Sequence, residues 1–306
     1  MENYQSTLQE TTIEPGDLKD KLFGQSNNVK VIPSEIENRT CSSCSAKSSD
    51  PPTYVYAIGS IEPRFRSKGI EKEFAQAIGR KDTAGLTDRQ ALHHVLSEPQ
   101  NRYLVRQLCW VFTIEGLETY ILQPLNPLDL DMLVDSLRPS PKRSDIDVVI
   151  GVLGPLASAE YCNGLQVPVV GFTQVYSFDV DSLIKSIPKP DKVSVKEFVP
   201  IAEELFMRIV QIADNAGATD DARALNYLLV RYDAIYATTA ECYNRNFSLT
   251  AVEVKPSALS GTRKIVDAIF TFNNRTTDFI EKYFCRVDIT EEFPFLVSKM
   301  QHYYHH

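Results

Sequence analysis

The strongest constraint in this sequence is a boundary near residue 53, where a polar segment gives way to an apolar, β-rich chain. Polar residues, Ser, Asn and Pro dominate residues 1–52, which end in a Ser-Ser-Asp-Pro-Pro run. Such a segment cannot bury enough apolar surface to order itself alone, so we expect a flexible tail or linker there. The foldable body therefore begins at Thr53.

The first part of the body, residues 53–190, mixes strand patterns with helix patterns. Aromatic and β-branched runs predict strands at 54–59, 145–151 and 167–172, and a hairpin over 108–115 and 117–123 around Gly116. Helical spacing is present over 71–79, after Thr87, over 129–137 and over 181–187. Pro63 is expected to end the first strand. These patterns predict an α/β part with a mixed sheet.

The second part, residues 191–306, begins after the Pro188-Lys-Pro190 run and has a different pattern. Ser194 and Glu197 form a predicted capping box that opens a helix, with Gly217 as its expected stop. A second helix is expected from Thr219 to about Tyr243. Strand patterns then follow at 247–254, 264–272 and 279–289. We predict a mixed α+β chain whose C-terminal part packs a helical hairpin on a three-stranded antiparallel meander.

Charge and hydropathy restrict the partners and the location that we expect. The chain has 306 residues and 40 acidic against 32 basic side chains, for a net charge of -8. An acidic protein is repelled by nucleic acids and anionic membranes, so neither is an expected partner. No apolar run reaches the roughly 18 residues that span a bilayer, and residues 1–20 lack the features of a secretory signal. The expected location is the cytoplasm.

Cys41 and Cys44 carry the clearest chemical signal. Two thiolates at this spacing can bind one Zn²⁺, which requires four ligands in a structural site. The remaining ligands would come from a distant cysteine such as Cys162 or from the same pair in a second subunit of a homodimer. The alternatives are an inert pair, an opportunistic disulfide or, least favoured, a redox site.

The other cysteines are Cys109, Cys162, Cys242 and Cys285. They are scattered along the chain and flanked by apolar or aromatic residues. Free cysteine in a reducing compartment is usually a small buried hydrophobe. We expect that role for all four.

Catalytic signatures do not emerge from the sequence, so we predict no catalytic residues. Of five histidines, three lie in the last five residues, and His93 and His94 are adjacent on a predicted helix. Gly-x-Ser-x-Gly, Walker A and Gly-x-Gly-x-x-Gly motifs are missing. Asp145 and Asp147 are expected to be solvated residues at a strand start.

Glu62, Arg64 and Arg66 are the best candidates for recognition. They follow the first predicted strand, and arginine forks suit a carboxylate or a peptide backbone. The alternative is an exposed Arg–Glu pair or simple solvation, which is common and contributes little.

Several segments together resemble one known family. They are YVYAIGSIEPRF at 54–65, EFAQA at 73–77, TAGLTDRQ at 83–90, CWVFTIEGLETYILQP at 109–124, YSF at 176–178, SLIKSIP at 182–188, ADNAGAT at 213–219 and EEFPFL at 291–296. They resemble the C-terminal domain of unknown function of the cyanobactin maturation proteases, the PatA and PatG type. The resemblance runs from about Tyr54 to the end, and residues 1–52 fall outside it.

This resemblance implies a place in cyanobactin biosynthesis, in which cyanobacteria modify, cleave and cyclise ribosomal precursor peptides. In the full proteases a subtilisin-like domain precedes this module, and the present chain has no such domain. We therefore expect a non-catalytic accessory module that binds precursor peptide or partner enzymes. The alternatives are a peptide-modifying enzyme of unrecognised type, and a module that only stabilises a fused protease.

Overall fold

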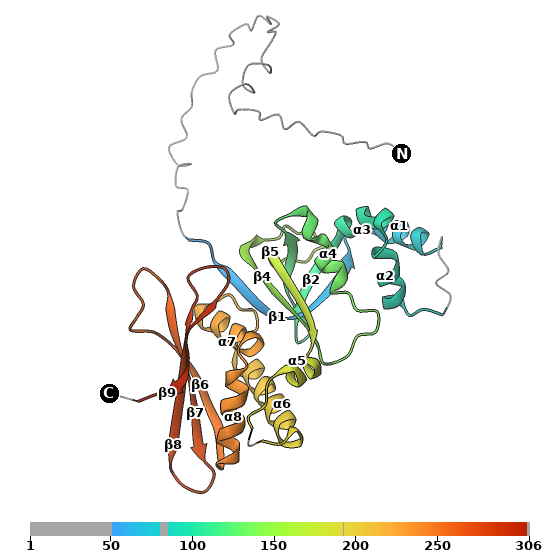
Figure 1. Ribbon diagram of the computed structural model, residues 1–306. Coiled ribbons are helices and arrows are strands. Elements are labelled where there is room, and N and C mark those ends of the chain that lie inside the picture. The colour runs from blue at the N-terminus through green and yellow to red at the C-terminus, as the bar shows by residue number, and fades with distance from the viewer. Residues whose placement is uncertain (1–50, 80–84, 192, 305–306) are drawn as a thin grey trace, which may run out of the picture. The chain divides into compact units, whose positions relative to one another are not determined.

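The computed structural model describes residues 51–79, 85–191 and 193–304 (Figure 1). These residues form a mixed α+β fold with two sheets, as the sequence predicts. The first sheet contains β1 (Tyr54–Phe65), β2 (Leu108–Ile114), β3 (Leu117–Pro124), β4 (Asp145–Leu156) and β5 (Pro168–Asp179). The second contains β6 (Phe247–Pro256), β7 (Ile265–Asn274), β8 (Ile280–Asp288) and β9 (Phe295–His302).

The first sheet closes into a barrel in the order β1-β2-β3-β5-β4, because β4 pairs again with β1. Only β3 and β5 run parallel, so the mixed sheet predicted from the sequence is confirmed. β1 pairs with β4 over residues 54–59 and with β2 over residues 60–65. The backbones approach closely where β1 changes partners, since a Cβ on Gly59 would lie 2.3 Å from the Thr113 carbonyl oxygen.

Pro63 does not end β1, contrary to the prediction. The strand continues to Phe65, and Pro63 lies opposite Trp110 of β2. Over residues 60–65 the structure pairs β1 with β2 alone, so a residue without an N–H is tolerated there. The predicted hairpin is confirmed between β2 and β3. Glu115 and Gly116 form its turn, both with positive φ (50° and 82°), as a type I′ turn requires.

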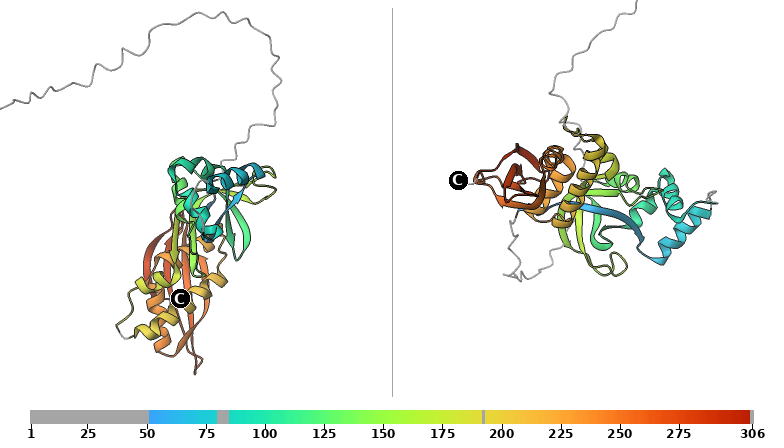
Figure 2. Two further views of the ribbon diagram at one scale, coloured as in Figure 1. Left: turned by 90° about the vertical axis from the view of Figure 1, so that its right-hand side faces the viewer. Right: turned by 90° about the horizontal axis from the view of Figure 1, so that it is seen from below.

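Short helices fill the connections between the strands of the barrel. Between β1 and β2 lie α1 (Lys68–Gly79), α2 (Asp88–Leu96), the 3₁₀ turn η1 (Pro99–Asn101) and α3 (Arg102–Gln107). The 3₁₀ turn η2 (Pro127–Asp129) and α4 (Leu130–Asp135) follow β3. Their buried side chains share one hydrophobic cluster with the barrel interior, which includes Trp110, Phe112 and Phe172. Figure 2 shows α1 to α3 gathered to one side of the barrel.

The helical segment that follows the barrel contains α5 (Val180–Ser186), α6 (Val195–Ile212), α7 (Asp220–Arg231) and α8 (Ala234–Asn244). The capping box of Ser194 and Glu197 is present at the start of α6. Gly217 is not the stop of that helix, which ends at Ile212. The expected helix from Thr219 to Tyr243 is two helices, because Tyr232 leaves the helical conformation with φ -123° and ψ 91°.

Gly217 instead packs against the barrel wall. Its φ is +62°, and a Cβ on it would lie 1.9 Å from the Tyr56 carbonyl oxygen. The Gly217 and Asn215 carbonyls accept hydrogen bonds from the backbone N–H groups of Tyr56 and Ile58, both at 2.9 Å. The turn before α7 thus occupies the side of β1 opposite to β4.

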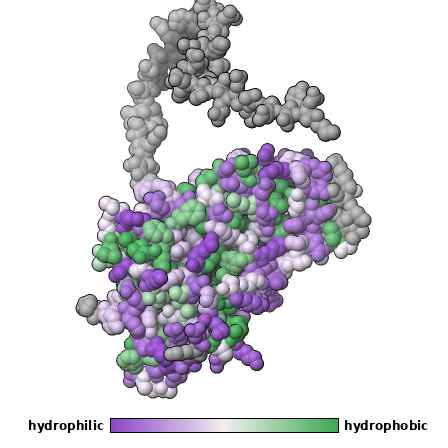
Figure 3. Space-filling model, viewed as in Figure 1, coloured by the Kyte–Doolittle hydropathy of each residue, from purple (hydrophilic) through white to green (hydrophobic). Residues whose placement is uncertain are grey.

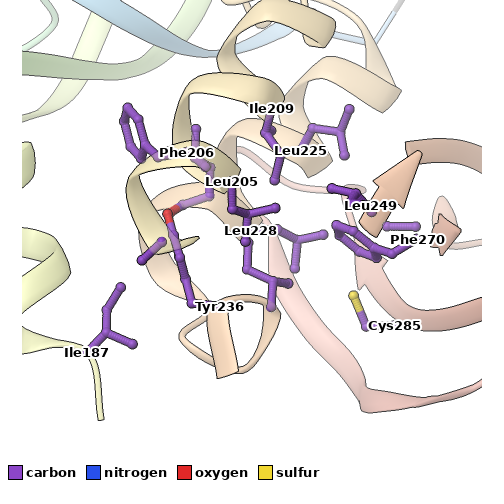
Figure 4. Close-up of a cluster of buried hydrophobic side chains, with 14 of the residues drawn as sticks. Ile187, Leu205, Phe206, Ile209, Leu225, Leu228, Tyr236, Leu249, Phe270 and Cys285 are labelled. Carbon is purple, nitrogen blue, oxygen red and sulfur yellow. The ribbon is translucent and has the colours of Figure 1, made fainter. Parts of the chain in front are cut away.

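A larger hydrophobic cluster joins the outer face of β1 and β4 to the helices and the second sheet. Figure 4 shows side chains of α6, α7 and α8 meeting Leu249, Phe270 and Cys285 of the strands. The second sheet has the order β6-β7-β8-β9, so β9 is a fourth strand where the sequence predicted three and a docked tail. This cluster contains residues from both sides of position 190. The division into parts 53–190 and 191–306 therefore stays a prediction.

Candidate functional site

Glu62 and Arg64 lie on one side of β1, where they form an exposed charge cluster with Glu118 of β3. Arg64 Nη1 donates to Glu118 Oε1 at 2.5 Å, and Arg64 Nη2 lies 4.0 Å from Glu62 Oε2. All three side chains are at least two-fifths exposed. Two carboxylates therefore already engage the Arg64 guanidinium, as in an ordinary surface ion pair.

Arg66 has a different environment from its two neighbours in the predicted set. Its guanidinium carbon lies over the Tyr161 ring, 4.6 Å from the ring centroid. Its Nε is buried and has no hydrogen-bond partner among the described residues. Among the described residues no carboxylate forms an ion pair with Arg66. Its N–H groups are therefore not engaged by carboxylates, whereas those of Arg64 are.

Arg66 lines a cavity of about 220 Å³ at one end of the barrel, which we call the barrel-mouth cavity. Its lining residues are Arg66, Val105, Arg106, Leu108, Trp110, Leu122, Gln123, Pro124, Pro127, Leu130 and Tyr161. Five of these, Val105, Leu108, Trp110, Leu122 and Leu130, belong to the buried core, so the cavity has an apolar floor. Arg66 and Arg106 are its charged residues, and among the described residues no acidic side chain lines it.

Local structure places each wall of this cavity. The chain passes from α3 straight into β2 at Leu108, and the Trp110 indole N–H donates to the Val105 carbonyl at 3.0 Å. Pro124 ends β3, and Pro127 opens η2. Sequence reasoning found Arg66 but missed Arg106 and Tyr161, because no spacing in the chain relates residues 66, 106 and 161.

A disulfide fixes the segment that carries Tyr161. Cys109 of β2 is bonded to Cys162, with their Cα atoms 5.8 Å apart. The expectation that these two cysteines are free is therefore wrong: they come together because the 157–167 segment folds back over the outer face of β2 and β3. Cys242 and Cys285 are free and buried, as expected. Burial raises the pKa of these two thiols to about 11 and about 12, which disfavours the thiolate.

A larger cavity of about 650 Å³ lies at the start of α7. Arg223 forms part of its wall, and the guanidinium carbon lies 5.3 Å from the Tyr54 ring centroid. Both Nη atoms of Arg223 donate to backbone carbonyls, at 2.8 Å to Ile289 and 2.5 Å to Glu291. Lys264 lies 3.5 Å from Asp220 in the same wall. Backbone carbonyls thus engage Arg223, and Asp220 engages Lys264.

Asp147 is buried, with 7 % of its surface exposed, so the expected solvated role is wrong. Its carboxylate accepts hydrogen bonds from the Ile61 N–H at 2.7 Å and the Ser177 hydroxyl at 2.6 Å. Desolvation nevertheless raises its pKa above the ordinary value. Asp145 is paired with Arg138 and also accepts from the Lys142 N–H. Both carboxylates therefore have structural partners within the barrel.

Two further sequence predictions concern metals and membranes. Cys41 and Cys44 lie outside the described residues, so the zinc site stays a prediction. Within the described residues no three His, Cys, Asp or Glu side chains are grouped so that they could hold a metal ion. None of the described helices combines the length and the hydropathy needed to cross a bilayer.

Comparisons with known proteins identify the family. The chain is similar to a solved structure entitled PatG Domain of Unknown Function, with a TM-score of 0.67 and 19 % sequence identity over 82 % of this chain and 99 % of that one. At this identity the similarity establishes the fold. No curated protein matches the chain. A family model named PatG Domain matches residues 54–255, which is more than half of the chain. The chain therefore belongs to the PatG domain family.

Proposed function

We propose that this chain is a non-catalytic recognition module in cyanobactin biosynthesis, which binds precursor peptide or partner enzymes. Membership of the PatG domain family supports the pathway, and the barrel-mouth cavity supports a binding role. The observation that carries the proposal is the pair of arginines, Arg66 and Arg106, at a cavity with an apolar floor. Apolar cavities with a few placed polar groups are typical binding sites.

The chemistry of the buried titratable groups also favours binding over catalysis. Asp147 is engaged by a backbone N–H and a hydroxyl, and burial keeps Cys242 and Cys285 in the thiol form. These groups pack the fold and do not line the barrel-mouth cavity. The face shown in Figure 3 mixes hydrophilic and hydrophobic residues.

The direct test is titration of the full chain with a labelled precursor peptide, with its leader and core segments separately, and with the partner enzymes. We expect saturable binding of at least one of them. The absence of binding to all of them at high micromolar concentration would contradict the proposal. Incubating the chain with precursor peptide and measuring peptide mass distinguishes binding from modification, for which we expect no mass change.

Zinc at Cys41 and Cys44, shared across a homodimer, is a separate proposal. Its support is the spacing of the two thiols, which suits two of the four ligands of a structural zinc site. Metal analysis and the oligomeric state of the wild type and of Cys41→Ser test it together. We expect the substitution to lower both the zinc content and the dimer fraction. A metal-free, monomeric wild type would exclude this site.

A further inference from the structure

We infer that the barrel-mouth cavity binds a carboxylate group of a peptide, with Arg66 and Arg106 as its anion-binding residues. This inference rests on the proposed recognition function and names the chemical group that is recognised. A peptide offers a carboxylate from two sources, an acidic side chain or the C-terminus. Both have the same planar pair of oxygens, which matches the fork of a guanidinium.

The charge distribution around the barrel supports an anion as the ligand. Three other arginines of this part of the fold have carboxylate partners, Arg64 with Glu118, Arg102 with Asp131 and Arg138 with Asp145, whereas Arg89 and Arg143 have none among the described residues. Neither Arg66 nor Arg106 forms an ion pair with any residue that the structure describes. The cavity therefore has two positive charges that its own lining does not neutralise. An acidic ligand would supply the missing partner at an entrance that is partly shielded from water.

The donor capacity of Arg66 supports the same conclusion. A guanidinium has five N–H donors and no acceptor, so it needs oxygen atoms around it. Arg66 lies over the Tyr161 ring, a contact that engages its face and leaves the N–H edge for acceptors. Its buried Nε has no acceptor among the described residues, a state it shares with Arg102 and Arg223. Unlike those two arginines, however, Arg66 also has no described acceptor at its Nη atoms. The guanidinium is thus oriented by Tyr161 while its donors remain incompletely used.

The size of the cavity suits a single residue of a peptide. Its volume is about 220 Å³. One acidic side chain, or one C-terminal residue, fits this space, whereas a folded segment does not. The apolar floor that includes Trp110 and Leu122 suits the hydrocarbon part of such a residue.

Tyr161 acts as a positioning residue in this arrangement. It touches Arg66, and the neighbouring Cys162 is bonded to Cys109 of β2. The Tyr161 N–H also donates to the Ser158 carbonyl at 3.0 Å, which holds the local turn. Together the disulfide and the turn fix the ring against which the guanidinium lies.

The test uses the full chain and short fluorescent peptides that differ in one group. One peptide has an internal Glu and an amidated C-terminus, one has no acidic side chain and a free C-terminal carboxylate, and one has Gln and an amidated C-terminus. We expect the Gln amide peptide to bind at least about tenfold more weakly than one of the two carboxylate peptides. The stronger carboxylate peptide identifies the source. Inorganic phosphate and acetate are added as competitors in separate titrations.

The variants are Arg66→Ala, Arg66→Lys and Arg106→Ala, with Arg64→Ala as the matched control. Arg64 lies two residues away but is engaged by Glu118 outside the cavity. We expect Arg66→Ala and Arg106→Ala each to weaken carboxylate binding about tenfold, Arg66→Lys to recover part of it, and Arg64→Ala to change it by less than about twofold. Because Arg106 is exposed, its variant keeps the test valid if Arg66→Ala unfolds.

The outcomes separate this inference from the proposed function. If precursor peptide binds and the arginine variants bind it equally well, the carboxylate site is wrong and the recognition function stands. If precursor peptide and partner enzymes do not bind but the carboxylate peptides do, the site stands and the proposed function fails. Equal binding of the carboxylate and Gln amide peptides overturns the inference. Displacement by phosphate at lower concentration than by acetate also overturns it, because it indicates a phosphate site.

Discussion

Two arginines of this molecule lie over tyrosine rings and line cavities, yet their surroundings differ. Arg223 of α7 faces Tyr54, has 3 % of its surface exposed, and donates to the carbonyls of Ile289, Glu291 and Glu292. Arg66 faces Tyr161 and has no such carbonyl acceptors among the described residues, although the Nε of both arginines is buried there without a hydrogen-bond partner. The same arginine–tyrosine contact is thus structural where carbonyls surround the guanidinium, and is available for a ligand where they do not.

The difference follows from what each guanidinium meets along the chain. The segment after β8 directs three backbone carbonyls at Arg223, those of Ile289, Glu291 and Glu292. Burial lowers the pKa of Arg223, an effect that the negative charge of Asp220 opposes. An arginine remains charged even so, because its ordinary pKa lies far above neutrality. Arg223 is therefore a buried charge whose hydrogen bonds tie α7 to residues 289–292.

The largest expected effect comes from removing that tie. Arg223→Ala leaves three carbonyls without their donor and should lower the free energy of unfolding by about 3–5 kcal/mol. Arg66→Ala, which removes no hydrogen bond described by the structure, should lower it by less than about 1 kcal/mol. Urea unfolding of both variants and the wild type, followed by circular dichroism, measures the two values. Similar losses for the two variants would remove the distinction between a structural and a ligand-binding arginine.

The next largest effect is expected from the disulfide that anchors the segment carrying Tyr161, the residue over which Arg66 lies. The Cys109–Cys162 disulfide closes a loop with a sequence separation of 53 residues, and such a cross-link stabilises a protein by about 2–4 kcal/mol. Reduction, or the double variant Cys109→Ser/Cys162→Ser, should lower stability by about that amount. It should also weaken carboxylate-peptide binding, because the segment that carries Tyr161 loses its anchor.

The control for this prediction is Cys242→Ser, which changes a buried free thiol and leaves the disulfide intact. Dithiothreitol should shift the urea midpoint of the wild type and of Cys242→Ser, and leave that of the double serine variant unchanged. An unchanged midpoint for the wild type would show that the disulfide contributes nothing to stability.

The sequence predicted most elements of the fold because they depend on local patterns. The capping box at Ser194 and the hairpin turn at Gly116 are encoded within a few residues, and both are present. The errors arose where a distant contact determines the outcome. Pro63 fits in β1 because only β2 pairs with that half of the strand. Gly217 does not end a helix but allows the backbone to approach the Tyr56 carbonyl closely.

The candidate site was predicted only in part for the same physical reason. Arg66 could be singled out because an arginine after a predicted strand is a recognisable feature. The pairing of β1 with β2 brings Arg106 to it, and the packing of the 157–167 segment on β2 and β3 brings Tyr161 there and Cys162 to Cys109. Glu62 and Arg64 share the sequence pattern of Arg66, and their contacts with each other and with Glu118 distinguish them only in three dimensions.

A smaller effect is expected on the pH dependence of stability, through Asp147. Like Arg223, Asp147 is a buried ionisable residue. Its pKa is raised in the folded protein by desolvation, so the folded state binds more protons than the unfolded state above the ordinary pKa of 3.8. Wild-type stability should therefore decrease relative to Asp147→Asn as pH rises from about 4 towards 7. Urea unfolding of both proteins across this range measures the difference. A wild type that gains stability over Asp147→Asn with rising pH would show that the hydrogen bonds from Ile61 and Ser177 outweigh desolvation.

The smallest expected effect is that of Arg64→Ala, and it tests whether position on β1 alone distinguishes a binding arginine. Arg64 and Arg66 are two residues apart and carry the same charge, so a general electrostatic attraction for acidic peptides would weaken about equally in either variant. A specific site would respond to Arg66→Ala and not to Arg64→Ala. Exposed ion pairs such as Arg64–Glu118 contribute about 0–1 kcal/mol, so the stability change should be small as well.

Titrations of the carboxylate peptide at low and high salt separate the two cases, because salt screens exposed charges more strongly than partly buried ones. Equal losses for Arg64→Ala and Arg66→Ala that vanish together in high salt would mean that the barrel mouth attracts anions without a defined site.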